Sequence, residues 1–246
     1  MFSSRFACIV WVCPLLFAAC GTESTASSST DDVTADTAGS DAAGACSAVH
    51  VITARASNET PGEGRTSALV DQIVAQSKQS VTRAAVAYPA TLTGYANSSA
   101  AGVTALKAQL IAQVQACPNQ KIVLAGYSQG AHVVLDVLGG GGGGALGALT
   151  DPVDSAVADH VTAVVTFADP RHVINQPYDK GTSLRNGKYP RTDAQLQVLS
   201  GLAAKIETFC DTDDLYCDSG TSLTVHQTYL ARYQQTALDF VLGRVQ

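Results

Sequence analysis

Residues 126–130 read Gly-Tyr-Ser-Gln-Gly, the pattern of a nucleophile elbow. In such an elbow a serine occupies a sharp, strained turn between a strand and a helix, so that its hydroxyl is exposed. The flanking glycines let neighbouring backbone come close. The pentapeptide alone is a weak signal, but the strand-type residues 121–125 precede it and an amphipathic helix pattern follows it. This setting predicts Ser128 as a nucleophile.

A serine hydroxyl needs a neighbouring base, most often histidine, to become a good nucleophile. Hydrolases with this elbow carry their residues in the chain order Ser, Asp, His. Beyond the helix that starts at the elbow, three histidines follow Ser128, namely His160, His172 and His226. Only His226 also follows the last predicted strand, so it is the predicted base. His132 lies on the helix that starts at the elbow, and an elbow points its serine away from that helix.

The third partner is a carboxylate that orients the imidazole and stabilises its charged form. Asp169, at the end of a predicted strand, is one candidate. Four others crowd around a segment bounded by two cysteines: Asp211, Asp213, Asp214 and Asp218. A disulfide-closed loop would hold a carboxylate in a fixed place. The loop is therefore favoured, while the choice among its aspartates stays open.

The rest of the body must position these groups, and it alternates between strand-like and helix-like segments. Strands are predicted at 49–54, 84–88, 121–127, 161–168 and 204–209, and helices at 66–80, 100–116, 129–138 and 225–242. Alternating elements with continuous apolar strands predict an α/β fold. We expect a three-layer α/β/α sandwich around a central, mainly parallel sheet of five strands.

Composition narrows the classes of function. The 246 residues are 46% apolar, enough for a sizeable core, and their formal net charge is -6. This charge argues against a nucleic-acid partner, because no basic stripe could neutralise phosphates. No CxxC or HExxH spacing occurs, so no metal or other cofactor is expected. Six glycines at 139–144 follow a helix and lack a GK[ST] ending, which predicts a flexible helix cap and loop and not a phosphate cradle.

The N-terminus is typical of an export signal, with a short positive start and an apolar stretch, 6–19, too short to span a bilayer. Residues 17–21 read Phe-Ala-Ala-Cys-Gly and resemble the bacterial lipobox, with Phe17 where leucine is usual. An ordinary cleaved signal is the alternative. We expect a signal peptide at 1–19, lipidation at Cys20, and a flexible Ser/Thr/Asp-rich linker up to residue 45. The protein would then be exported, and either held at the cell envelope or surface or secreted.

Four cysteines remain in the body: Cys46, Cys117, Cys210 and Cys217. An even number in an exported domain predicts two disulfides. Three pairings are possible. Cys210 and Cys217 are close enough in sequence to close a small loop, and the other two would then pair.

Together these residues resemble the cutinase and acetylxylan esterase family of small serine esterases. The resemblance covers about 46–245 and rests on separated motifs: Ala54-Arg55 with Ser57 and Glu59, 121–130, 167–170, 210–217 and His226. The family implies a lidless α/β-hydrolase fold in the domain 46–246.

The resemblance also implies particular partners. It implies the disulfides Cys46–Cys117 and Cys210–Cys217. It implies that the acid is Asp214, the fourth residue after the first cysteine of the loop. The oxyanion hole would be formed by the backbone N–H of Gln129 and by Ser57, beside Ala56, where cutinases have glycine.

These residues predict an exported serine esterase that cleaves carboxylic esters through an acyl-enzyme, acting as a monomer. Short acyl esters such as acetylated xylan are favoured, because 169–172 and Tyr216-Cys217 look closer to the acetylxylan esterase branch. Hydrolysis of cutin or lipid esters is the alternative and should need more exposed apolar residues around the site. A surface binding protein on an inactive hydrolase scaffold is less favoured, because Ser128, Asp214 and His226 are all present. Contact with a membrane is expected only through the lipid anchor.

Overall fold

The computed structural model describes residues 46–246, so the expected signal peptide, Cys20 and the linker lie outside the described residues. The described chain forms a six-stranded sheet in the order β2-β1-β3-β4-β6-β5, with every neighbouring pair parallel. The strands are β1 Val49–Ala54, β2 Val81–Ala85, β3 Lys121–Tyr127, β4 Val161–Phe167, β5 Asp179–Lys180 and β6 Ile206–Phe209. Parallel strands require crossover connections, which the intervening helices supply.

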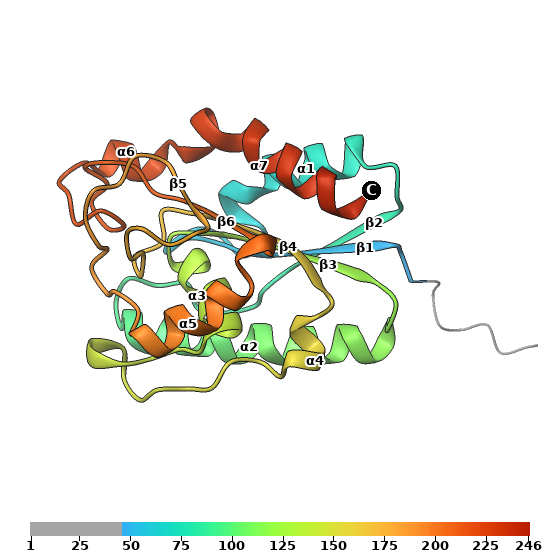
Figure 1. Ribbon diagram of the computed structural model, residues 1–246, viewed down its shortest axis with the longest axis horizontal. Helices are drawn as coiled ribbons and strands as arrows, with labels where there is room; N and C mark the ends of the chain where they lie inside the picture. The colour runs from blue at the N-terminus through green and yellow to red at the C-terminus, as the bar shows by residue number, and fades with distance from the viewer. Residues whose placement is uncertain (1–45) are drawn as a thin grey trace, which may run out of the picture. The chain divides into compact units, whose positions relative to one another are not determined.

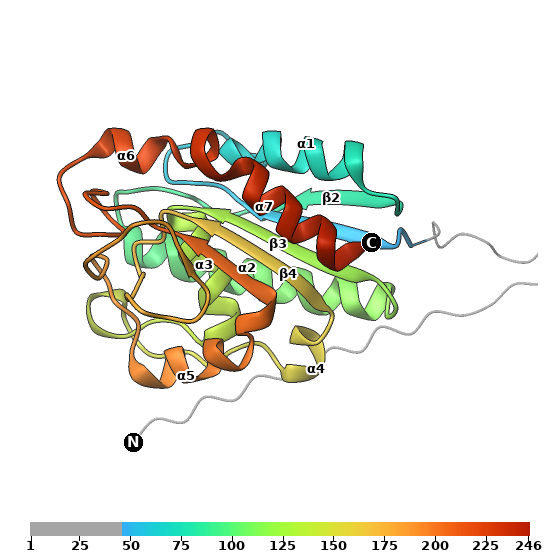
Figure 2. The same cartoon turned by 45° about the horizontal axis from the view of Figure 1, so that its top comes forward.

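Helices cover both faces of this sheet (Figure 1). They are α1 Ser67–Gln76, α2 Tyr95–Ala116, α3 Gln129–Gly139, α4 Ser155–Ala158, α5 Asp193–Gly201, α6 Leu223–Gln227 and α7 Tyr229–Val245. The long helices α1 and α7 pack together on one face, and α2, α3 and α5 pack on the other (Figure 2). The predicted three-layer α/β/α architecture is confirmed. Within residues 46–246, no helix has both the length and the apolar character needed to cross a bilayer.

Alternation along the strands produces two cores, one under each helical layer. On β3, Ile122 and Leu124 belong to the core shared with α2 and α3, whereas Val123 and Ala125 belong to the core shared with α1 and α7. Successive side chains of a strand point to opposite faces, so a strand covered on both sides must be apolar throughout. All of α3 is buried. The elbow therefore joins two elements that are fixed by packing.

The predicted strand count is wrong by one, because β5 adds a sixth strand. Its two residues have no apolar run, so the sequence pattern gave no sign of it. Backbone bonds define it: the N–H of Thr208 donates to Tyr178 at 3.1 Å, and the N–H of Cys210 donates to Lys180 at 3.0 Å. The edge strand β2 also starts earlier than predicted, because its register with β1 begins at the Val49 and Val81 pair.

The predicted closing helix is two helices, α6 and α7, separated at Thr228. His226 consequently lies in the last turn of α6 and not at the start of a long helix. The helix α5 was not predicted. A capping box starts it, in which Thr192 and Gln195 each bond the other's backbone N–H.

Both disulfides pair as the resemblance implies. Cys46–Cys117 joins the chain just before β1 to the chain after α2, with 5.7 Å between the Cα atoms. Cys210–Cys217 closes the loop after β6, with 6.0 Å between the Cα atoms. One disulfide therefore ties the amino ends of two neighbouring strands, and the other shapes the loop that carries Asp214.

Candidate active site

Ser128 occupies the turn between β3 and α3, with φ of 53°. A non-glycine residue in this region is strained, and such strain is held only where the surroundings enforce it. Here the N–H of Ser128 donates to the carbonyl of Phe167 on β4 at 2.8 Å. The turn thus lies at the carboxyl edge of the sheet, where α/β proteins place their ligand sites.

The two glycines of the elbow are required because neighbouring backbone leaves no room for a side chain. A Cβ on Gly126 would lie 2.5 Å from the carbonyl oxygen of Gly130. A Cβ on Gly130 would lie 1.9 Å from the carbonyl oxygen of Ala54 on β1. No side chain fits at such distances, so the close approach of β1, β3 and α3 depends on glycine at both positions.

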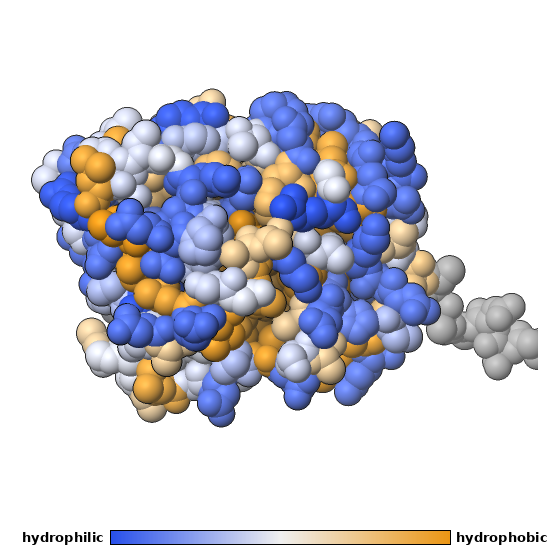
Figure 3. Space-filling view, in the orientation of Figure 1, coloured by the Kyte–Doolittle hydropathy of each residue, from blue (hydrophilic) through white to orange (hydrophobic). Residues whose placement is uncertain are grey.

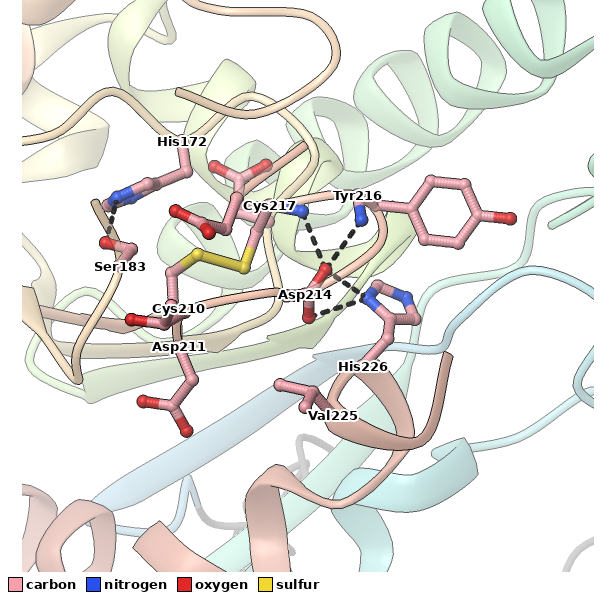
Figure 4. The surroundings of a disulfide bond; sticks show 12 residues. His172, Ser183, Cys210, Asp211, Asp214, Tyr216, Cys217, Val225 and His226 are labelled. Atoms are coloured by element: carbon pink, nitrogen blue, oxygen red, sulfur yellow. Dashed lines mark hydrogen bonds and ion pairs between the residues drawn. A yellow bond between two sulfur atoms is a disulfide. The ribbon is translucent and has the colours of Figure 1, made fainter. Parts of the chain in front are cut away.

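The structure brings Ser128, His226 and Asp214 together. The Nε2 atom of His226 lies 2.9 Å from the Ser128 Oγ. The Nδ1 atom lies 3.0 Å from both carboxylate oxygens of Asp214 (Figure 4). All three side chains are buried. An imidazole held between a carboxylate and a hydroxyl can accept the hydroxyl proton, which is the arrangement that activates a serine.

Asp214 is fully buried, yet it is surrounded by donors. Its Oδ1 accepts the backbone N–H groups of Tyr216 at 2.7 Å and Cys217 at 2.8 Å (Figure 4). Its Oδ2 accepts the hydroxyl of Tyr229 at 2.9 Å. Burial, the largest influence, raises the pKa of Asp214, but the hydrogen bond and charge of His226 and the two backbone donors outweigh it and lower the pKa. The carboxylate is therefore ionised at neutral pH.

The other four aspartates have other partners. Asp169 pairs with a buried arginine. Asp211 pairs with Arg232 at 2.8 Å. Asp213 accepts the backbone N–H of Thr221. Asp218 accepts three backbone N–H groups from nearby loops. The geometry around His226 thus distinguishes Asp214 within a loop where sequence reasoning could not choose.

His172 takes part in a similar but differently charged arrangement (Figure 4). Its Nε2 lies 2.8 Å from the Ser183 Oγ, and its Nδ1 lies 3.6 Å from Asp179 Oδ1. Burial raises the pKa of Asp179 to about 7 and lowers the pKa of His172. Below pH 7 the Asp179 carboxyl is therefore mostly protonated, unlike that of Asp214. Neither His172 nor Ser183 lines the pocket beside Ser128.

A buried charge cluster surrounds Asp136, in α3. Asp136 pairs with Arg171 and with Arg191, and its Oδ2 lies 3.0 Å from His132 Nε2. Burial, the largest influence on the pKa of Asp136, raises it, but His132 and the two arginines lower it to about 2. His132 is thus engaged away from Ser128, as expected for a residue on the helix after the elbow. Sequence reasoning did not anticipate this cluster.

The two predicted oxyanion residues are also adjacent. The Ser57 hydroxyl donates to the side-chain oxygen of Gln129 at 3.2 Å. Gln129 is the first residue of α3, so its backbone N–H has no acceptor within the helix. The turn that carries Ser57 is fixed by Glu59, whose carboxylate accepts the N–H of Ala56 at 2.7 Å. The methyl group of Ala56 is accommodated in a buried position.

An open pocket of about 370 Å³ lies beside Ser128 and His226. It is lined by Ala56, Ser57, Asn58, Glu59, Arg65, Leu92, Tyr127, Ser128, Tyr216, Leu223, His226 and Gln227. The Tyr216 ring meets the His226 imidazole edge-on, with 4.7 Å between their centroids. The lining combines polar side chains with two tyrosines and two exposed leucines, so the pocket could hold a small ester. Within residues 46–246, no three His, Cys, Asp or Glu side chains are grouped to hold a metal ion.

Two tyrosines that sequence reasoning missed support these residues. The hydroxyl of Tyr127 donates to the carbonyl of His226 at 2.6 Å, and Tyr229 bonds Asp214. Tyr127 lies 99 residues from its partner, so no local pattern could reveal the contact. Its position directly before the predicted nucleophile was the one available signal.

Comparisons with known proteins agree with this fold. The chain matches the Cutinase family over residues 45–245. It is 34% identical to an acetylxylan esterase of Hypocrea jecorina over 205 residues, 80% of this chain and 67% of that protein. It is 32% identical to Cutinase 11 of Verticillium dahliae over 209 residues, 81% of this chain and 70% of that protein. The catalytic core domain of acetyl xylan esterase from Trichoderma reesei superposes with a TM-score of 0.75 and 32% identity, covering 81% of this chain and all of that chain.

A parallel sheet between two helical layers, with a serine elbow at its carboxyl edge, defines a small α/β-hydrolase. Within that class the chain belongs to the cutinase family and is a carboxylic ester hydrolase of the serine esterase type. The family resemblance seen in the sequence is confirmed.

Proposed function

We propose that the chain is an exported serine esterase that cleaves small acyl esters through Ser128, His226 and Asp214. The observation that carries this proposal is the 2.9 Å contact of His226 Nε2 with Ser128 Oγ, at the wall of an open pocket. Asp214, on the other side of the imidazole, is charged and fully buried. The reaction follows from this order of groups.

In the first step Ser128 Oγ attacks the ester carbonyl while its proton moves to His226 Nε2. The tetrahedral oxyanion is held by the N–H of Gln129 and by Ser57, whose hydroxyl turns from the Gln129 side chain toward the new charge. The alcohol leaves with the proton from His226, and Ser128 keeps the acyl group. Asp214 stabilises the imidazolium formed on the way.

In the second step water replaces the alcohol. His226 takes a proton from the water, which attacks the acyl carbonyl, and the proton returns to Ser128 as the acid departs. The open pocket admits this water directly. The enzyme ends in its starting state, with one ester bond hydrolysed to an alcohol and an acid.

The test of this mechanism is Ser128→Ala, assayed on p-nitrophenyl acetate and labelled with a fluorophosphonate probe. We expect turnover to fall at least about ten-thousandfold, because the nucleophile of a triad cannot be replaced by its neighbours. The probe should label the wild type and not the variant. A fully active Ser128→Ala protein, or a wild type that the probe leaves unlabelled, would show a different mechanism or a non-catalytic binding protein.

Short acyl groups are favoured as substrates, with acetylated xylan as the polymer. Polar side chains, including Asn58, Glu59 and Arg65, line part of the pocket, and the Tyr216 ring lies against His226. The similar acetylxylan esterases support the same choice. We expect kcat/KM to be at least about tenfold higher for p-nitrophenyl acetate than for the octanoate, with acetate released from acetylated xylan.

A lipid or cutin ester is the second candidate, because Leu92 and Leu223 are 48% and 47% exposed and both line the pocket. Figure 3 also shows apolar residues in a broken band over the loops near α6, interrupted by polar ones. If these leucines bind a long acyl chain, Leu223→Ser should lower octanoate turnover and leave acetate turnover unchanged. Equal effects on both esters would remove this candidate.

Export is supported by the two disulfides, which form in oxidising compartments. The monomeric state and a lipid on Cys20 stay predictions from the sequence. Mass spectrometry of the mature protein tests the lipid. The acyl mass should disappear in Cys20→Ser, and its absence from the wild type would indicate an ordinary cleaved signal.

A further inference from the structure

Asp214 receives donors from three separate parts of the chain. The backbone N–H groups of Tyr216 and Cys217 come from its own loop, and the Nδ1 of His226 comes from α6. The fourth donor is the hydroxyl of Tyr229, the first residue of α7. Oδ1 is held by the two loop N–H groups as well as by His226, and Tyr229 is the non-histidine partner of Oδ2. Without it, Oδ2 would keep His226 as its one hydrogen-bond partner among the described residues.

The hydrogen of the Tyr229 hydroxyl can be assigned from its neighbours. The oxygen accepts the backbone N–H of Asp211 at 2.7 Å. A phenol has one hydrogen to donate, and an ionised carboxylate can only accept. The hydrogen therefore points to Asp214 Oδ2, 2.9 Å away, since the other near atom is a disulfide sulfur of Cys217 at 3.2 Å. Burial and the charge of Asp214 raise the pKa of Tyr229, so the phenol keeps this hydrogen.

The Tyr229 ring is itself fixed. It is fully buried. It meets the Tyr127 ring edge-on, at 6.2 Å between centroids, and Arg232 lies over its face at 4.8 Å. Tyr127 in turn holds the carbonyl of His226. The same pair of rings thus contacts both the acid and the histidine.

We propose that Tyr229 is a positioning residue for ester hydrolysis, whose hydroxyl holds Asp214 in the orientation that pairs with His226. A hydrogen bond to Oδ2 disperses charge on the carboxylate and fixes its plane. Removing the bond leaves a more basic carboxylate whose Oδ2 is less well restrained, so that it holds the imidazolium more tightly and in a less well defined orientation toward Ser128. This inference rests on the proposed function.

The test is Tyr229→Phe, which removes the hydroxyl and keeps the ring. We expect kcat/KM for p-nitrophenyl acetate to fall about 10- to 100-fold, with the loss in kcat and KM unchanged. We also expect the acidic limb of the pH profile to move up by about half a unit. The backbone N–H of Asp211 also loses its acceptor in this variant, so some stability will be lost in any case. The concentration of active enzyme is therefore measured with a fluorophosphonate probe.

The matched control is Tyr233→Phe, the same change one turn later on α7. The Tyr233 hydroxyl donates to Asp211 at 2.7 Å, and Asp214 is not its partner. This control should keep the wild-type kcat and pH profile. A wild-type profile in Tyr229→Phe, or an equal shift in both variants, would overturn the proposal.

A second replacement keeps the test decisive if Tyr229→Phe does not fold. Placing 4-aminophenylalanine at 229 retains a donor of the same size that is weaker than a phenol. Its kcat and acidic limb should lie between those of the wild type and Tyr229→Phe, and an unmoved limb would refute the role of the bond. Failure of the proposed function is distinguishable, because it would appear as activity in Ser128→Ala, whatever the Tyr229 variants do.

Discussion

Asp214 and Asp179 are two carboxylates beside histidines, and their surroundings move their pKa values in opposite directions. Asp214 has three donors besides His226, so its charge is stabilised. Asp179 has one backbone donor, from Gln176 at 2.8 Å, and an Oδ1 with no hydrogen-bond partner among the described residues. The number of donors, more than the depth of burial, separates the acid with the lowered pKa from the acid with the raised pKa.

This contrast predicts how stability depends on pH. The unfolded Asp179 ionises near the ordinary aspartate pKa of 3.8, while burial keeps the folded group protonated up to about 7. The folded state therefore binds the extra proton in this window, and its stability falls as pH rises through it. The lowered pKa of Asp214 acts in the opposite sense, stabilising the fold above the unfolded pKa and losing that contribution as pH falls.

Asp179→Asn should remove the part of the slope that belongs to Asp179. On going from a buffer below the ordinary aspartate pKa to a slightly alkaline one, we expect the free energy of unfolding of the variant to rise by about 4 kcal/mol relative to that of the wild type. Urea unfolding followed across this range measures the difference at each pH. A difference that stays constant with pH would contradict a raised pKa at Asp179.

The site residues differ in how far they could be predicted from the sequence. Ser128 was predictable because its glycines and flanking elements lie within a few positions of it. Asp214 could be restricted to a loop but not chosen from the residues alone, because the choice depends on which carboxylate meets His226 across space. Tyr229 was not predictable, since tyrosine at a helix start has no distinctive pattern.

Among the elements, the glycine segment 139–144 ends α3, as predicted, and also makes hydrogen bonds to other parts of the chain. Gly141 and Thr150 bond each other's backbone in both directions, at 3.0 and 2.9 Å. The carbonyl of Gly142 accepts from the buried side chain of Arg171 at 2.9 Å. The glycines therefore form a defined connection that ties the end of α3 to the charge cluster around Asp136.

Substitutions within this segment should lower the free energy of unfolding by different amounts. Gly142 has φ of +71°, and a Cβ there would lie 1.9 Å from the carbonyl of Ala148, whereas Gly144 has φ of +55° with nothing within 4 Å. We expect Gly144→Ala to cost about 1 kcal/mol from backbone strain alone. Gly142→Ala should cost about 3 kcal/mol or more. Chemical denaturation of both variants measures the two losses in the free energy of unfolding. Equal losses would show that the backbone near Ala148 moves to accommodate the new methyl group at little cost.

The elements that sequence predicted best are those whose burial is continuous. The strands β1, β3 and β4 are covered on both faces, so their apolar runs are long and clear. The strand β5, by contrast, is set by its backbone pairing with β6. Such tertiary effects leave no periodic trace in the residues.

Two disulfides stabilise the described chain, one at the amino ends of the strands and one beyond a carboxyl end. The Cys46–Cys117 disulfide fastens the amino ends of β1 and β3, and the Cys210–Cys217 disulfide fastens the loop beyond the carboxyl end of β6. In a chain-entropy estimate the longer loop stabilises the fold by about 4 kcal/mol and the shorter one by about 2.5 kcal/mol. The first disulfide supports the fold, and the second also shapes the surroundings of Asp214.

All strands run the same way, so the chain enters the sheet at the edge opposite the pocket. The helix α7 runs back toward that entry edge, and the C-terminus lies there as well (Figure 1). Both attachment points of the domain therefore face away from the elbow. A fusion partner, a purification tag or a solid support joined at either end would leave the catalytic face turned outward, free to meet a substrate too large to diffuse.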